Sequence, residues 1–505
     1  MMASGLNDHL EKLFGVPLLL AVVATGLITP PLLLLYRRRL SVWMGRKAGE
    51  TPPATLPESP FRAALPTSER LRRRSQAAVG ARARAWFLGF AAQAAVLTGL
   101  FAAQYASAIS APAMVVALGV FLIPAALVLL TESKASGWSR LLAVGTGLLV
   151  LMLWRGPSGE LLGAIALLYV VVPMLPLLLF HLRFWRGAAP LVFLLLLMGF
   201  SGWVLATVLV KGALGNNPGP IIGLARAGGL AAGLGLGVWL LRGVAERHAR
   251  GIMSERIFAL DIWWLLYTLV QAFVVGIRLG SWAAVVALLS FPIGRWIAGR
   301  ALGRLDASEA PPLRLLLLRV FGNSRRSERL FEQLVQAWSP LGSIELIGGA
   351  DLALQQVSPL DFLAFVTGRL RERFGQAPSE ATARLAKPPT RATDGSYPAR
   401  QTFCHADVWE PTMQRLLAAS DAVVMDLRQF QAQRAGCRVE LEALARSGSD
   451  RPIVLVIDDS TNLPLVRQLL AAAGADHQKP PWHFVTASAR EATTVGRVLD
   501  AVGGL

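Results

Sequence analysis

Two glutamates lie two positions apart in the stretch SDAVVMDLRQFQAQRAGCRVELEAL, residues 420–444. The pattern predicts a buried strand over 421–427, a polar loop, and a helix over 435–448 that carries Glu440 and Glu442. At 100° per residue, Glu440 lies at the edge of the apolar stripe of this helix, half-buried, whereas Glu442 points to solvent. A carboxylate placed like Glu440, near the helix N-terminus, can stabilise or attack an oxocarbenium-like centre, as glycosidic cleavage requires. A glutamate that only caps its helix or forms a salt bridge fits the same spacing, so both roles stay open.

The elements that position this helix begin at residue 305. Short apolar strands without period-two alternation follow one another with helices between them, which predicts a parallel sheet covered on both faces. Ligands bind such sheets outside the carboxyl ends of the strands. The predicted strands are 313–321, 344–347, 421–427, 451–459 and 482–487, and the predicted helices are 327–338, 361–374, 410–420, 435–448, 461–474 and 488–503. Residues 375–400, rich in Pro, Ser and Thr, are predicted to be an insertion.

Four further candidates lie where predicted strands end. Arg319, Ser324 and Arg325 follow or end the first strand and could meet phosphate groups, and Asp426 ends the strand that precedes the helix of the two glutamates. Each of these residues also fits a surface or capping role. The chain shows no GxGxxG or Walker motif, and no Cys and His spacing indicates a metal site. Two cysteines in 505 residues do not support a disulfide framework.

The first 304 residues have the composition of a membrane protein. They hold 28 Lys and Arg against 10 Asp and Glu, a net charge of +18, whereas residues 305–505 hold 22 of each kind. Because the positive excess lies in the hydrophobic half, it argues against nucleic acid as a partner and for basic loops beside membrane lipids. Nine spans are predicted, at 14–36, 86–108, 114–131, 138–154, 161–181, 190–210, 221–241, 257–277 and 283–300.

The loop 37–85 carries twelve of the basic residues and is predicted to be flexible. The positive-inside rule places this loop and the C-terminal half in the cytosol, with the chain as a multi-pass protein of a bacterial-type inner membrane. Arg226 and Asp261 lie in neighbouring predicted spans and are candidates for an ion pair or for a transport path. The span 221–241 is rich in Gly and Ala, which predicts a close helix contact within the bundle or between copies of the chain.

The element Cys437-x-x-Glu440-Leu441, on a helix that follows a Ser-Asp turn and a strand, resembles TIR (Toll/interleukin receptor) domains. The stretch LLLLRVFGNSRRSERLFEQL resembles the strand, polar loop and helix with which TIR domains open. The resemblance covers roughly residues 313–503, and the insertion at 375–400 departs from it. The aromatic residue usual after the first strand is not clearly placed. The same part of the chain is also similar to nucleoside deoxyribosyltransferases and their relatives.

The resemblance implies a doubly wound, flavodoxin-like or TIR-like sheet and a role in signalling or defence. In the enzymatic members of both groups the helix glutamate acts at the C1′ carbon of a ribose. Glu440 would then be the catalytic carboxylate in hydrolysis of the N-glycosidic bond of NAD or a related nucleotide. NAD would be a substrate, and no cofactor is implied. Two alternatives stay open: a non-catalytic, membrane-anchored interaction module that oligomerises, and a transporter or channel regulated by its cytosolic domain.

Overall fold

The chain folds into two compact units. The structure is a computed structural model, and it describes residues 2–45, 65–104, 111–126, 188–215, 219–249, 254–303, 311–319, 325–348, 359–373, 385, 388–405, 408–433, 435–447, 451–476 and 481–503. The membrane unit comprises Met1–Leu34, Val79–Asp306 and Ser358–Thr367. The α/β unit comprises Leu35–Ala78, Ala307–Val357 and Gly368–Leu505. The α/β unit therefore takes in a segment from the N-terminal third of the chain.

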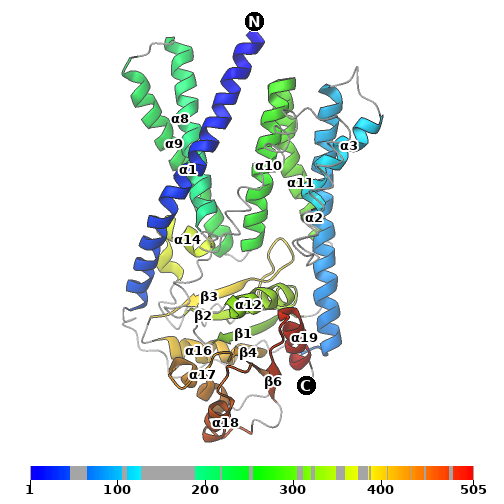
Figure 1. The fold of residues 1–505 in the computed structure, drawn as a ribbon, viewed down its shortest axis with the longest axis vertical. Coiled ribbons are helices and arrows are strands. Elements are labelled where there is room, and N and C mark those ends of the chain that lie inside the picture. The colour runs from blue at the N-terminus through cyan, green and yellow to red at the C-terminus, as the bar shows by residue number, and fades with distance from the viewer. Residues whose placement is uncertain are drawn as a thin grey trace. The chain divides into compact units, whose positions relative to one another are not determined.

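The α/β unit is built on a six-stranded sheet in which all neighbouring strands are parallel (Figure 1). The strands are β1 (Leu313–Arg319), β2 (Gly342–Gly348), β3 (Ala399–Phe403), β4 (Ala422–Asp426), β5 (Ile453–Ile457) and β6 (Trp482–Thr486). Their order is β3-β2-β1-β4-β5-β6. The predicted parallel α/β sheet is confirmed, and the five predicted strands are all present.

Strand β3 is the element that the sequence pattern did not predict. It follows Pro398, has the polar sequence ARQTF, and lies at the edge of the sheet beside β2, with Gln401 opposite Leu346. An edge strand is covered on fewer sides than a central strand, so it needs no apolar run. The stretch 375–400, predicted to be an insertion, thus ends at the start of this added edge strand.

Helices cover both faces of the sheet, as predicted. Besides the end of α1 (Met2–Met44) and the start of α2 (Ser68–Gln104), the described helices of the α/β unit are α12 (Arg325–Trp338), the 3₁₀ helix η2 (Leu370–Arg373), α16 (Trp409–Ala418), α17 (Ala435–Arg446), α18 (Leu463–Ala472) and α19 (Glu491–Val502). One buried cluster joins α16, α17 and α18 to the sheet through residues such as Leu416, Leu441 and Leu470. The other joins α12 and α19 to the opposite face through residues such as Leu334 and Val498.

The predicted helix 361–374 is shorter in the structure. Helix α14 (Pro359–Val366) ends before Gly368, whose φ of +77° is a left-handed conformation that glycine adopts without strain. The 3₁₀ helix η2 then takes up the following residues. Helix α14 belongs to the membrane unit, where it contacts α9 (Ile221–Ala249).

The start of helix α2 (Ser68–Gln104) is part of the α/β unit. Leu71 is fully buried in the cluster that α12 and α19 form. Ser75 Oγ donates a 2.7 Å hydrogen bond to the carbonyl of Ala337, and Arg72 pairs with Asp500. The expectation of a flexible loop over 37–85 is therefore wrong for 68–85. It is also wrong for 37–44, which end helix α1 (Met2–Met44). Arginines dominate the composition of both segments, but a helix can expose its arginines on one face and bury leucine on the other.

The membrane unit contains long apolar helices. Its other described helices are α3 (Ala111–Phe121), α8 (Ala189–Leu214), α10 (Glu255–Leu279) and α11 (Ser281–Gly303). Within the described residues, four helices are long and apolar enough to cross a membrane: 68–104, 189–214, 221–247 and 282–303. This number is smaller than the nine predicted spans. The predicted spans 138–154 and 161–181 lie outside the described residues, and α3 has 11 residues where a span of 114–131 was predicted.

Small residues bring the membrane-unit helices together. A Cβ on Gly202 of α8 would lie 2.2 Å from the carbonyl oxygen of Gly229 on α9, so only glycine fits this contact. Gly89 of α2 and Gly294 of α11 meet in the same way, with a Cβ on Gly89 placed 2.6 Å from the Gly294 oxygen. The close helix contact predicted for 221–241 is confirmed within the chain.

Two charged side chains of the membrane unit, Asp261 and Arg226, pair with the helix that is adjacent in sequence. Asp261 of α10 lies 2.9 Å from Arg295 of α11, and Arg226 of α9 donates to Thr207 of α8 at 3.2 Å. The predicted pairing of Arg226 with Asp261 is therefore wrong. Each charge finds its partner on the helix that is adjacent in sequence, which is the shortest route to satisfying it. Buried Gln93 of α2 differs, since it bonds to Thr268, Ser290 and Trp264 on helices α10 and α11, 171 to 197 positions later in the chain.

We expect the Leu71→Ala variant to destabilise the α/β unit by about 2–5 kcal/mol, because it leaves a cavity between α12 and α19. Hydrogen exchange of the β1 amides in the full chain measures the change, since β1 contributes to the same cluster. The matched control is Arg73→Ala, two positions away with 77% of its side chain exposed, which should leave these rates nearly unchanged. Equal rates in wild type and Leu71→Ala would show that α2 does not stabilise this unit.

Candidate functional site

The strand order reverses direction between β1 and β4. From β1 the chain proceeds outward through β2 to β3, and it then returns to place β4 on the other side of β1. The carboxyl ends of the two strands lie together, since Arg319 is opposite Asp426 in the register. In open α/β sheets, this reversal creates the crevice in which ligands bind. The candidate site therefore lies at this edge, with the loops that follow β1, β4, β5 and β6.

Glu440 is a buried carboxyl on α17, the helix after β4. Its exposed fraction is 2%, and its Oε2 has no hydrogen-bond partner among the residues that the structure describes. Burial raises the pKa of Glu440 from 4.5 to about 8. Glu442 differs on both counts, since 36% of its side chain is exposed and it pairs with Arg446 one turn later. The prediction that Glu440 is the more buried of the two is confirmed, and the burial is more complete than predicted.

The loop before α17 fixes where this helix begins. Leu427 and Phe430 are both fully buried and anchor the loop in the core beneath α16–α18. Between them Gln429 adopts a φ of +63°, and its N–H donates a 2.9 Å hydrogen bond to Ser460 Oγ. The N–H of Asn462 donates to the carbonyl of Phe430 at 3.0 Å. The loops after β4 and β5 therefore hold each other, and α17 starts from a rigid support.

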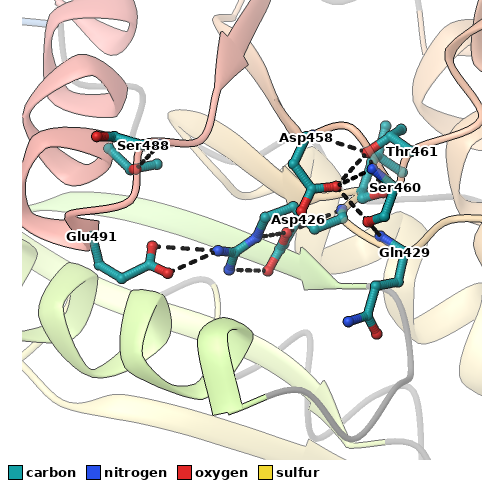
Figure 2. A network of polar contacts seen from close by, with 10 residues as sticks. Asp426, Gln429, Asp458, Ser460, Thr461, Ser488 and Glu491 are labelled. Atoms are coloured by element: carbon teal, nitrogen blue, oxygen red, sulfur yellow. Dashed lines mark hydrogen bonds and ion pairs between the residues drawn. The ribbon is translucent and has the colours of Figure 1, made fainter.

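Asp426 is engaged in a buried ion cluster. Arg428 Nε and Nη2 each lie 2.8 Å from a carboxylate oxygen of Asp426, and Arg428 Nη1 lies 3.1 and 3.3 Å from the oxygens of Glu491 (Figure 2). Burial alone would lower the pKa of Arg428, but the hydrogen bonds and charges of the two carboxylates outweigh it and raise the pKa. Asp426 thus holds the loop to the start of α19, and its predicted role in nucleotide binding stays a prediction.

Arg428 and Glu491 are the members of this site that sequence reasoning missed. They are 63 positions apart, and no spacing rule connects a residue after one strand with the first residue of the last helix. The sequence held only a weak signal for this cluster. Asp426 and Arg428 lie two positions apart at the end of a predicted strand, in a half of the chain where acidic and basic residues are equal in number.

Asp458, at the end of β5, organises a turn. Its Oδ1 accepts hydrogen bonds from Ser460 N–H at 3.0 Å and from Ser460 Oγ at 2.5 Å (Figure 2). Thr461 Oγ1 lies 3.3 Å from the same oxygen and 3.0 Å from the carbonyl of Leu427. Asp458 therefore serves the contact between the loops after β4 and β5.

The three phosphate-binding candidates are placed only in part. Arg319 ends β1 and Arg325 begins α12, but their side chains lie outside the described residues, as does Ser324 altogether. Their role stays a prediction. Among the described residues, no three His, Cys, Asp or Glu side chains gather in a way that could hold a metal ion. Cys404 and Cys437 are buried thiols.

Comparison of the chain with protein-family models, curated proteins and solved structures finds no match. The TIR-like interpretation therefore stays a prediction that depends on the residues from Cys437 to Leu441 and on the opening strand and helix. The geometry adds one fact to it: on the helix after β4 lies a buried carboxyl whose Oε2 has no hydrogen-bond partner within the described part of the chain.

We expect Glu440 to make the stability of the protein depend on pH. The folded state binds the Glu440 proton more tightly than the unfolded chain, so its contribution is fully present below pH 4.5 and is lost as the pH rises through about 8. Between these values the free energy of unfolding should fall by about 1.4 kcal/mol per pH unit. Glu440→Gln removes this slope and becomes more stable than wild type at pH 8.

Chemical denaturation of the full chain between pH 5 and 8 tests this expectation. The matched control is Glu442→Gln, two positions along the same helix, which should follow the wild-type pH dependence. A Glu440→Gln variant with the wild-type slope would show that Glu440 is ionised in the folded protein throughout this range.

We expect Arg428→Ala to lower the free energy of unfolding by about 3–5 kcal/mol, because it leaves the buried carboxylates of Asp426 and Glu491 without their counter-charge. The triple variant Asp426→Asn, Arg428→Met, Glu491→Gln removes all three charges and should recover most of the loss. Thermal unfolding at constant pH compares the two. If Arg428→Ala costs less than about 1 kcal/mol, the cluster does not hold the loops of the site.

Proposed function

We propose that this chain is a multi-pass membrane protein whose cytosolic, TIR-like α/β unit hydrolyses the N-glycosidic bond of NAD or a related nucleotide. The bacterial-type inner membrane, about nine spans and a role in signalling or defence belong to the same proposal. Glu440 is the proposed catalytic carboxylate. The observation that carries the proposal is the burial of Glu440 on the helix that follows β4, with no hydrogen-bond partner for Oε2 among the described residues.

The position of Glu440 argues against the ordinary structural roles of a helix glutamate. Among the described residues it forms no ion pair, unlike Glu442, and its Oε2 makes no hydrogen bond. A buried polar atom without a partner costs stability, so its presence calls for a compensating role. A shifted pKa caused by burial, close to a ligand-binding edge, is typical of functional carboxyls.

The chemistry follows from the charge of the substrate. A pKa of about 8 keeps Glu440 protonated at neutral pH in the absence of ligand. A nucleotide whose ribose carries a cationic nicotinamide would lower this pKa, and the proton would leave to solvent. The carboxylate then stabilises the positive charge that develops on the ribose as the C1′–N bond breaks with its electron pair going to nicotinamide. Water adds to C1′ and loses a proton, which yields ADP-ribose, nicotinamide and one proton.

One observation favours the non-catalytic alternative. With 2% exposure, Glu440 is closed to solvent, as in a domain that acts through its surface as an interaction module. Asp426, which would otherwise be available to a ligand at this edge, is committed to Arg428. The two functions differ in a simple measurement, since only the first consumes NAD.

We expect full-length protein, reconstituted in lipid nanodiscs at a density that permits oligomers, to release nicotinamide from NAD. Glu440→Gln should lower kcat by at least about 100-fold, because it keeps the shape of the side chain and removes its charge. Glu442→Gln is the control and should keep wild-type activity. Chromatography of nicotinamide and ADP-ribose measures both products. No release by folded wild type, or equal activity in Glu440→Gln, would favour the interaction module.

A further inference from the structure

The end of helix α1 carries a groove on one side. Leu35, Arg38, Arg39 and Val42 are spaced at i, i+3, i+4 and i+7, so they share one helical face, and Trp43 lies beside them. Together these five residues line an open hollow of about 380 Å³. All five belong to the α/β unit.

The two sides of this helix segment differ in burial. Tyr36 and Leu40 are fully buried, whereas Leu35 and Val42 are 52% and 51% exposed. Neighbouring Leu34 is 65% exposed. Large aliphatic side chains gathered on one exposed face indicate a surface that another apolar group covers.

The charged residues of the groove indicate that the molecule covering it also carries a negative charge. Arg38 and Arg39 are exposed, and neither has an ion-pair partner among the described residues, in contrast to Arg72 and Arg73 at the start of α2. Two adjacent unpaired guanidinium groups are suited to a phosphate, to which each can donate two hydrogen bonds. The groove therefore combines a site for an anion with aliphatic walls.

We propose that this groove binds an anionic phospholipid, with its phosphate on Arg38 and Arg39 and its glycerol and first acyl carbons against Leu35 and Val42. A soluble phosphate would satisfy the arginines and leave the aliphatic side chains in water. The groove follows directly on the apolar run 14–36, and tryptophan and arginine at the end of such a run are typical of the head-group layer.

A lipid in the groove would stabilise the α/β unit. Trp43, which forms one wall, is tied to this unit through its carbonyl oxygen, 2.8 Å from Nδ1 of His405 just after β3. The guanidinium of Arg371 lies 6.0 Å from the Trp43 ring. The groove exists only when the end of α1 is packed on the α/β unit. A ligand that binds the groove therefore stabilises the folded unit.

The test is native mass spectrometry of the full-length protein with phosphatidylglycerol or phosphatidylcholine. We expect Arg38→Gln/Arg39→Gln to bind phosphatidylglycerol about 30-fold more weakly, since each basic residue near an anionic lipid raises the affinity about fivefold. The matched control is Arg70→Gln/Arg73→Gln, which removes two exposed arginines from α2 and should bind within about threefold of wild type. Phosphatidylglycerol should also raise the Tm of wild type and not that of Arg38→Gln/Arg39→Gln.

Three results would overturn the proposal. Equal weakening of phosphatidylglycerol binding by both double variants would mean that the lipid binds through the net positive charge of the protein and not through this groove. Equal binding of phosphatidylcholine would mean that the arginines do not select the head group. Displacement of phosphatidylglycerol by millimolar inorganic phosphate would assign the groove to a soluble anion. Glutamine is a good helix former, and hydrogen exchange of β3 that matches wild type in lipid-free detergent verifies that the variant is folded.

Discussion

A polar group that loses contact with water must find a partner inside the protein, and this cost shapes both units. In the α/β unit, Asp426 and Glu491 lie inside the protein only because Arg428 bonds to both of them. The pairs hold the loops after β4 and β6 at the carboxyl edge of the sheet. In the membrane unit, Asp261 lies beside Arg295, and Gln93 bonds to three neighbours at once. These bonds select which helices lie side by side where apolar packing alone would allow several arrangements.

Glu440 departs from this rule among the described residues, as do the side-chain amide of Gln271 and the Nε and Nη1 atoms of Arg415. For Glu440, the helix, the anchored loop and the depth in the core are all regular features of the fold, yet no described residue forms a hydrogen bond with its Oε2. Other parts of the unit supply the stability that this costs, as at many functional sites. Burial raises the pKa of Glu440, because a charged carboxylate in this position would lose its contact with water. A neutral acid in a dry position responds strongly to a nearby positive charge, which is the property that the proposed chemistry requires.

The sequence was sufficient for features that depend on local pattern. Apolar runs predicted β1, β2, β4, β5 and β6, and helical periodicity predicted that Glu440 is more buried than Glu442. The remaining features depend on contacts between distant residues. Strand β3 is a polar edge strand whose partner β2 decides its conformation. Arg428 meets Glu491 across 63 positions, and Leu71 packs against helices more than 250 positions later. The pairing of Asp261 with Arg295 instead of Arg226 depended on which helices pack together, which periodicity does not reveal.

The chain segments that make up the α/β unit determine which form of the protein is suitable for testing its function. Hydrophobicity and charge divide the chain near residue 305, but the folded unit also includes Leu35–Ala78. Leu71 completes the core between α12 and α19, and Trp43 bonds to the residue that follows edge strand β3. A fragment that begins at residue 305 would expose both contact surfaces. An inactive fragment would therefore say little about Glu440, because the loss could arise from the missing helix ends. The proposed chemistry at the carboxyl edge of the sheet must therefore be tested in the full chain, in which α1 and α2 each contribute residues to both units.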